Sequence, residues 1–272
     1  MILVTGATGN MGRPLVRRLL TAGVPVRATT RSYGRARATL PSGIDVLVGD
    51  LDTPEFRRQA LAGVDQVFVQ LDAGEAQAIL RSCAEAGVRR VVLVTSLNAQ
   101  VRPQGFVGSG SLAAEALMRD LGLRGTVLRP WEFASNSLAL AADIRSTGIV
   151  RRPAGSRPSP TIHPTDLAAV GEVVLTQDGH DDRTYALTGP VELTCADKLA
   201  ILGEALGRAL KFEECHDPDQ DAAVRAAPDQ VSGSLGLCYL ESPGVLGAVE
   251  ELTGRPPRGY EEWVAENVAR FR

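Results

Sequence analysis

The stretch Val4-Thr5-Gly6-Ala7-Thr8-Gly9-Asn10-Met11-Gly12 places glycines at positions 6, 9 and 12, close to the amino end of the chain. It follows the apolar run Ile2-Leu3-Val4, which is typical of a buried strand. It also opens a segment, 11–22, whose apolar residues recur at helical spacing. A glycine-rich turn between a buried strand and a helix is the arrangement that holds the diphosphate of a dinucleotide.

Each glycine of this turn has a separate role. Gly6 permits the tight turn, Gly9 lets the backbone approach the diphosphate, and Gly12 lets the helix pack closely against the strand. The amides at the start of the helix then face the phosphate charge. The predicted cofactor contacts in this loop are Gly6, Thr8, Gly9, Asn10, Met11 and Gly12. The alternative is a glycine-rich turn that binds nothing.

The end of the second expected strand, 24–30, discriminates between the two nicotinamide cofactors. An enzyme that uses NAD places an acid about 20 residues beyond the loop, where it holds the ribose 2′-hydroxyl. Here the chain reads Ala28-Thr29-Thr30-Arg31-Ser32-Tyr33, without an acid. Arg31 can pair with a 2′-phosphate and Ser32 can donate a hydrogen bond to it, so NADP(H) is favoured over NAD(H). The other interpretation is that Arg31 is a solvated surface side chain.

Apolar strands alternate with helical segments along the first half, which predicts a doubly wound parallel α/β sheet of the Rossmann type. We expect a dinucleotide-binding domain over residues 1–150 and a smaller α/β substrate lobe over 151–272, with some segments interleaved. Proline and glycine over 151–160 indicate a loop, and 108–111 reads as either a flap over the substrate or a purely structural loop. The expected strands are 2–4, 24–30, 45–48, 66–70, 90–95, 125–128, 183–187 and 211–214. The expected helices are 11–22, 76–86, 112–121, 165–175, 195–210, 245–252 and 260–271.

Composition narrows the class of protein. The 272 residues carry a formal net charge of -3, which gives no electrostatic reason to expect nucleic-acid binding. No apolar run approaches the roughly 18 residues that a bilayer span needs, and the first residues lack the features of a signal peptide. The four cysteines are scattered and form no zinc pattern. These observations predict a soluble cytoplasmic protein with reduced, structural thiols.

Further motifs resemble the NmrA-like, atypical branch of the extended short-chain dehydrogenase/reductase superfamily over nearly the whole chain. Besides the glycine loop, they are Gly49-Asp50-Leu51, Val94-Thr95-Ser96, Leu128-Arg129-Pro130-Trp131-Glu132-Phe133, Ile162-His163-Pro164-Thr165-Asp166-Leu167-Ala168, Tyr185-Ala186-Leu187-Thr188-Gly189-Pro190 and Arg255-Pro256-Pro257-Arg258.

The resemblance implies roles for individual positions. Asp50 would hold the adenine amino group, with Leu51 against the ring. Leu71 and its neighbours to Gly74 would line the ribose and nicotinamide side, Thr95 and Ser96 would lie beside the nicotinamide, and Pro130 to Phe133 would shape its pocket. His163 and Asp166 resemble a packing motif at the junction of the two lobes.

The usual proton donor of this superfamily is absent. Ordinary members use a tyrosine followed four residues later by a lysine, which lowers the phenol pKa. The four tyrosines, at 33, 185, 239 and 260, are followed at that spacing by Arg37, Gly189, Pro243 and Val264. The expected stretch, 105–115, contains neither residue type.

Three functions fit this departure. The first is an NADPH-dependent reductase of a quinone, an enone or an aromatic carbonyl compound, since the delocalised anion of such an acceptor needs orientation and hydrogen bonds more than a strong acid. Ser96, Asn98 and Ser111 are the candidate donors. The second is a non-catalytic dinucleotide-binding sensor or regulator, which would have a protein partner. The third is a non-redox cyclisation or coupling enzyme on the same scaffold.

Overall fold

The computed structural model describes residues 1–70, 73–152, 157–215, 219, 222, 226 and 240–272. Seven parallel strands form one sheet in the order β3-β2-β1-β4-β5-β6-β8. This is the predicted doubly wound Rossmann sheet. The strands are β1 (Ile2–Val4), β2 (Val26–Thr30), β3 (Asp45–Val48), β4 (Gln66–Val69), β5 (Arg90–Val94), β6 (Gly125–Pro130) and β8 (Arg183–Leu187).

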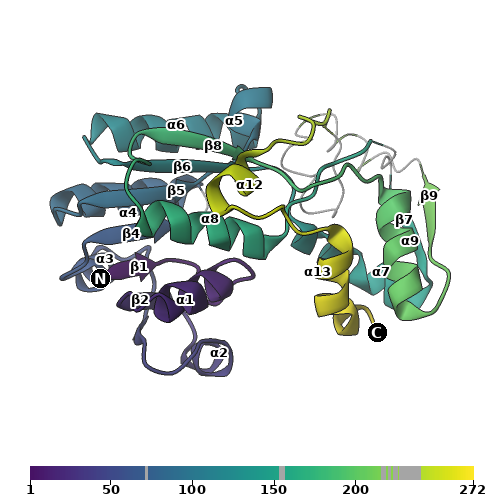
Figure 1. The fold of residues 1–272 in the computed structure, drawn as a ribbon, viewed down its shortest axis with the longest axis horizontal. Helices are drawn as coiled ribbons and strands as arrows, with labels where there is room; N and C mark the ends of the chain where they lie inside the picture. The colour runs from purple at the N-terminus through teal and green to yellow at the C-terminus, as the bar shows by residue number, and fades with distance from the viewer. Residues whose placement is uncertain (71–72, 153–156, 216–218, 220–221, 223–225, 227–239) are drawn as a thin grey trace.

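Helices cover both faces of the sheet, because successive strand residues point to opposite sides and both sets are apolar (Figure 1). Val4, Ala28 and Phe68 belong to the core on one face, where α1 (Gly12–Thr21) packs on α8 (Pro164–Thr176) and α8 on α12 (Ala248–Thr253). Leu3 and Leu93 belong to the core on the other face. That face is covered by α3 (Pro54–Leu61), α4 (Ala73–Glu85) and α6 (Phe106–Asp120).

The strand order reverses between β1 and β4, and the crevice of such a sheet lies outside the carboxyl ends of its strands at this point. Thr5 joins the two strand ends there. Its Oγ1 donates to the Phe68 carbonyl (3.1 Å) and accepts from the Gln70 N–H (2.8 Å). The short α2 (Tyr33–Thr39) and α5 (Asn98–Val101) follow the carboxyl ends of β2 and β5, so both begin at the edge where a ligand would bind.

A smaller lobe has its own core, which includes Ile144, Val150, Leu199, Trp263 and Phe271. Its elements are η1 (Ala134–Leu140), α7 (Ala141–Ser146), β7 (Ile149–Arg152), α9 (Cys195–Leu206), β9 (Lys211–Glu214), α13 (Tyr260–Asn267) and η2 (Val268–Phe271). The two lobes interleave along the chain, since η1 and α7 precede residue 150 whereas α8 and β8 follow it and return to the sheet. A single division at residue 150 therefore does not separate the lobes.

The glycine-rich segment 108–111 is helical, so it is neither a flap nor a loop. The predicted helix 112–121 in fact begins at Phe106. A Cβ on Gly108 would stand 1.9 Å from the Arg102 carbonyl oxygen and 2.6 Å from that of Asn98. The glycine thus allows α5 and α6 to pack closely, and this tertiary contact outweighs the low helix propensity of glycine.

Two further sequence predictions need correction. Arg151 and Arg152 were expected in a loop but complete β7, which pairs in parallel with the distant β9. The helix expected from residue 245 begins at Ala248. Among the described residues, no helix combines the length and apolar character needed to cross a lipid bilayer.

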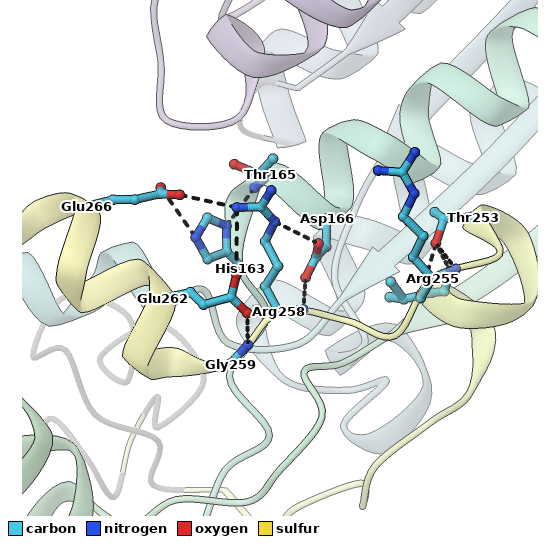
Figure 2. A network of polar contacts seen from close by, with 10 residues as sticks. His163, Thr165, Asp166, Thr253, Arg255, Arg258, Gly259, Glu262 and Glu266 are labelled. Atoms are coloured by element: carbon cyan, nitrogen blue, oxygen red, sulfur yellow. Dashed lines mark hydrogen bonds and ion pairs between the residues drawn. The ribbon is translucent and has the colours of Figure 1, made fainter.

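A polar cluster joins the first turn of α8 to α13 at the junction of the lobes (Figure 2). The Arg258 N–H donates to Asp166 Oδ2 (2.7 Å), and its guanidinium Nη1 donates to Glu266 Oε1 (3.2 Å). His163 precedes α8, where its Nδ1 accepts from the Thr165 N–H (3.1 Å), and its Nε2 lies 3.5 Å from Glu266 Oε2. His163 and Asp166 thus stand at the lobe junction.

Burial shifts the pKa values of Asp166 and His163 in this cluster. It raises the pKa of Asp166 to about 6, against the opposing effects of the Arg258 N–H and guanidinium. Burial also lowers the pKa of His163, with Glu266 acting in the opposite direction. The pKa of Asp166 is higher in the folded protein than the value of 3.8 that applies to the unfolded chain. The favourable contribution of Asp166 to the free energy of unfolding is therefore complete below pH 3.8 and is lost as the pH rises through about 6.

We therefore expect Asp166→Asn to become more stable relative to the wild type as the pH rises. Asparagine keeps an oxygen for the Arg258 N–H but has no charge to bury. The difference in unfolding free energy should move in favour of the variant by about 2 kcal/mol between pH 4.5 and 7.5. Urea unfolding at both pH values measures it. Asp120→Asn, at an exposed position, is the control; an equal and pH-independent effect for both variants would contradict the expectation.

Candidate functional site

The glycine loop forms a cradle that fits a diphosphate. Gly6 has a φ of 61°, in the left-handed region that favours glycine. A Cβ on Gly12 would lie 2.3 Å from the Gly6 carbonyl oxygen, so only glycine lets α1 begin this close to the turn. Among the described residues, no side chain caps the N-terminus of α1. The positive end of the helix dipole thus faces an anion without a side-chain cap in between. Of the first amides of the helix, that of Arg13 donates to the Gly9 carbonyl (3.2 Å), and Pro14 has no N–H.

The other predicted loop residues do not all line the same cavity. Thr8 and Gly6 line a cavity of about 190 Å³ at the carboxyl ends of β1, β2 and β3. Met11 is buried in the core beneath α1, so only its backbone can contact a ligand. Asn10 is exposed and lines a different cavity, beside His163 at the lobe junction.

The 190 Å³ cavity collects the residues expected around the adenosine half of the cofactor. Arg31, Ser32, Asp50 and Leu51 all line it, together with Arg35. The Arg35 N–H donates to Ser32 Oγ (3.3 Å), so the Ser32 hydroxyl proton is directed elsewhere. Asp50 Oδ1 accepts from the Asp52 N–H (3.0 Å). The cavity therefore presents two arginines at the end of β2 and a carboxylate at the end of β3.

A second cavity, of about 420 Å³, lies between α4, the carboxyl end of β5 and α6. Thr95, Ser96 and Ser111 line it. Its other described lining residues are apolar or small, apart from Ser109, which carries a hydroxyl. None of the described lining residues is ionisable. The other residues are Ala76, Leu93, Val94, Phe106, Val107, Ser109, Gly110 and Ala114. Glu75 lines the first cavity and Ala76 the second, so both cavities border the first turn of α4.

The predicted catalytic and pocket residues are only partly brought together. Asn98 is buried away from the cavity lining, and its N–H donates to Ser96 Oγ (3.2 Å). Pro130 ends β6 beside Leu97, whose N–H donates to the Pro130 carbonyl (3.0 Å), and Phe133 packs into the core beneath α8. Neither Pro130 nor Phe133 lines either cavity. Leu71 lies outside the described residues.

A buried ion pair beneath the second cavity was not predicted. Glu115, only 1% exposed, accepts from Arg129 Nε on Oε1 (3.0 Å) and from Arg129 Nη2 on Oε2 (2.6 Å). Thr95 Oγ1 donates to Glu115 Oε1 at 2.9 Å. A signal existed in the sequence: Glu115 falls on the apolar face of a helix and Arg129 within an apolar strand, and buried charges are almost always paired. The pairing itself, between α6 and β6, was visible only in the fold.

Of the described cysteines, none lines either cavity. Cys83 and Cys195 are buried, and burial raises the pKa of both thiols to about 12. Neither is a nucleophile at neutral pH, because the thiolate is the reactive form.

Comparison with known proteins agrees with this geometry. Residues 6–177 match a family model described as NAD(P)H-binding. The chain is 37% identical to a (4-alkanoyl-5-oxo-2,5-dihydrofuran-3-yl)methyl phosphate reductase of Streptomyces griseus subsp. griseus, over 100% of this chain and 99% of the relative. It is 31% identical to an NAD(P)H azoreductase of Xenophilus azovorans, with the same coverage.

Solved structures share the fold over the whole chain. The NADPH-dependent quinone oxidoreductase QOR2 of Escherichia coli, complexed with NADPH, has a TM-score of 0.77 at 24% identity and covers 99% of both chains. The triphenylmethane reductase of Citrobacter sp., complexed with NADP(H), has a TM-score of 0.78 at 22% identity, over 98% of this chain and 100% of that one. The chain therefore belongs to the NAD(P)H-binding family, shares its fold with these reductases, and is an NAD(P)H-dependent oxidoreductase.

Proposed function

We propose that the protein is an NADPH-dependent reductase of small, flat, conjugated acceptors, namely quinones and enones. The observation that carries the proposal is the second cavity: apolar walls, four hydroxyl-bearing side chains, and no ionisable lining residue among those described. NADPH held by the glycine loop would supply the hydride. The chain would contribute orientation, exclusion of water and hydrogen bonds to the developing oxyanion.

The missing tyrosine and lysine fit this class of acceptor. A quinone or an enone that receives a hydride becomes an anion delocalised over its carbonyl oxygens, which water or a weak donor can protonate. The substrate named for the Streptomyces relative has the same character, since its ring double bond is conjugated to two carbonyl groups. The quinone and azo acceptors named for other relatives are also conjugated.

Ser96 and Ser111 support the proposal as donors to the acceptor oxygen. Ser96 Oγ already accepts from the Asn98 N–H, so its own proton is left for a ligand in the cavity. Ser111 is 7% exposed and lines the same cavity from α6. It stands four residues before Glu115, within the stretch where ordinary members of the superfamily have tyrosine and lysine.

Two arginines support NADPH as the preferred cofactor. Arg31 and Arg35 line the cavity at the end of β2, where an NAD enzyme would have an acid. The acids of this cavity come from the end of β3 and from α4, away from the end of β2. A 2′-phosphate there would receive charge-assisted hydrogen bonds from guanidinium groups.

The reductase function predicts acceptor-dependent oxidation of NADPH. In stopped-flow measurements of NADPH absorbance, benzoquinones, naphthoquinones and a 4-acyl butenolide should each cause loss of the reduced cofactor. Tight NADPH binding with no oxidation by any acceptor would support a sensor in place of an enzyme. Conversion of a substrate without consumption of NADPH would support a non-redox reaction.

The cofactor preference predicts that Arg31→Ala weakens NADPH binding more than NADH binding. The selective loss should be roughly 1.5–3 kcal/mol, the scale of a hydrogen bond to a charged group. Calorimetric titration with both dinucleotides measures it. Arg37→Ala removes an exposed arginine of α2 that does not line the cavity, and it should leave the ratio of the two affinities unchanged. An equal loss of affinity for both dinucleotides in Arg31→Ala would show that Arg31 does not bind the 2′-phosphate.

The donor assignment predicts that Ser96→Ala lowers kcat tenfold to about a hundredfold with little change in KM, because the hydrogen bond strengthens as the oxyanion forms. Steady-state kinetics with a quinone acceptor tests this. Ser109→Ala is the matched control, since that hydroxyl lines the same cavity but donates to the Phe106 carbonyl (3.2 Å). A loss of kcat as large in the control would assign the effect to cavity shape.

A further inference from the structure

The hydroxyl of Thr95 has its direction set by the ion pair beneath it. Arg129 can only donate hydrogen bonds, and Glu115, clamped by that guanidinium on both oxygens, stands as a carboxylate that can only accept. Thr95 Oγ1 lies 2.9 Å from Glu115 Oε1. Its single proton must lie in this contact, so only the oxygen lone pairs of Thr95 are left to face the cavity.

The neighbouring residue has the opposite polarity. Ser96 Oγ accepts from the Asn98 N–H, and its proton is left to donate. The end of β5 thus presents an acceptor at Thr95 and a donor at Ser96, side by side in the cavity lining.

The order of the strands indicates which part of a ligand reaches Thr95. Arg31 lies at the end of β2, the diphosphate cradle follows β1, and Thr95 follows β5. In the sheet order β2-β1-β4-β5, three strand spacings of about 4.8 Å separate the two ends. A dinucleotide whose adenosine lies beside Arg31 and whose diphosphate lies at the loop extends its nicotinamide end toward β5.

We infer that Thr95, held as an acceptor by Glu115 and Arg129, accepts a hydrogen bond from the carboxamide N–H of the bound nicotinamide. Glu115 and Arg129 are then positioning residues: they touch neither cofactor nor substrate and act through the hydroxyl of Thr95. This inference deepens the proposed function, because the orientation of the nicotinamide ring decides which of its faces is turned toward the acceptor.

Glu115→Gln should release the fixed direction of the Thr95 hydroxyl. Glu115 Oε1 accepts from both Arg129 Nε and Thr95 Oγ1, and Oε2 accepts from Arg129 Nη2, so one amide oxygen cannot replace both acceptors. With the NH2 group at the Oε1 position, Thr95 Oγ1 accepts within the protein and its proton turns to the cavity. With the amide oxygen there, the hydroxyl keeps its direction.

The test is a calorimetric comparison of oxidised NADP and its 3-acetylpyridine analogue, in which a methyl ketone replaces the carboxamide and the N–H is lost. The wild type should bind NADP about fivefold more tightly than the analogue, the scale of one hydrogen bond. Thr95→Ser should keep this preference. Thr95→Val should abolish it, and Glu115→Gln should weaken it, because the direction of the Thr95 hydroxyl is then no longer fixed.

Thr95→Val keeps the test decisive if Glu115→Gln fails to fold, because it leaves the ion pair intact and removes only the hydroxyl. An unchanged preference in Thr95→Val overturns the inference, and so does a wild type that does not discriminate between the two dinucleotides. These measurements need no turnover. A failure of the reductase proposal, seen as the absence of NADPH oxidation, is therefore distinguishable from a failure of this one.

Discussion

The contact between the start of α1 and the turn after β1 is the constraint on which the binding edge of the molecule depends. The Gly6 carbonyl lies where a Cβ on residue 12 would stand, so the helix can begin this close to the sheet only with glycine at that position. This brings a helix start without a side-chain cap to the carboxyl edge, at the point where the strand order reverses. An anion bound there gains the helix dipole without displacing a side-chain cap.

The rest of the site follows from the parallel sheet. Parallel strands place all their carboxyl ends at one edge, so Arg31 after β2, Asp50 after β3 and Thr95 after β5 lie along one crevice despite their separation in sequence. The crevice is charged at its adenosine end and apolar at its other end. That gradient suits a dinucleotide phosphate paired with a neutral conjugated acceptor.

Buried charge supports the site from below and beside it. The Glu115–Arg129 pair lies under the apolar cavity and orients Thr95, while the Asp166–Arg258 contact joins α8 to the segment that leads into α13. Lys198 and Glu132 form a second buried ion pair (2.8 Å), between α9 and the segment after β6, whereas the Arg258 side chain is 41% exposed. Buried pairs of this kind add little net stability but strongly disfavour arrangements that separate the partners. They therefore fix how the lobes and the cavity walls meet.

The sequence by itself determined the Rossmann sheet, the diphosphate loop, the arginine and serine after β2, and the absence of a tyrosine and lysine pair. These features are local: periodicity, a glycine spacing and the residue that ends a strand are all properties of short segments. Only the tertiary structure decided that segment 108–111 is helical, that Asn98 does not line the cavity, and that Thr95 is bound to Glu115. Each of these depends on a segment distant in the chain or on close backbone packing between neighbouring helices. The energies of such contacts arise between elements, so they leave no periodic pattern in the sequence of any one element.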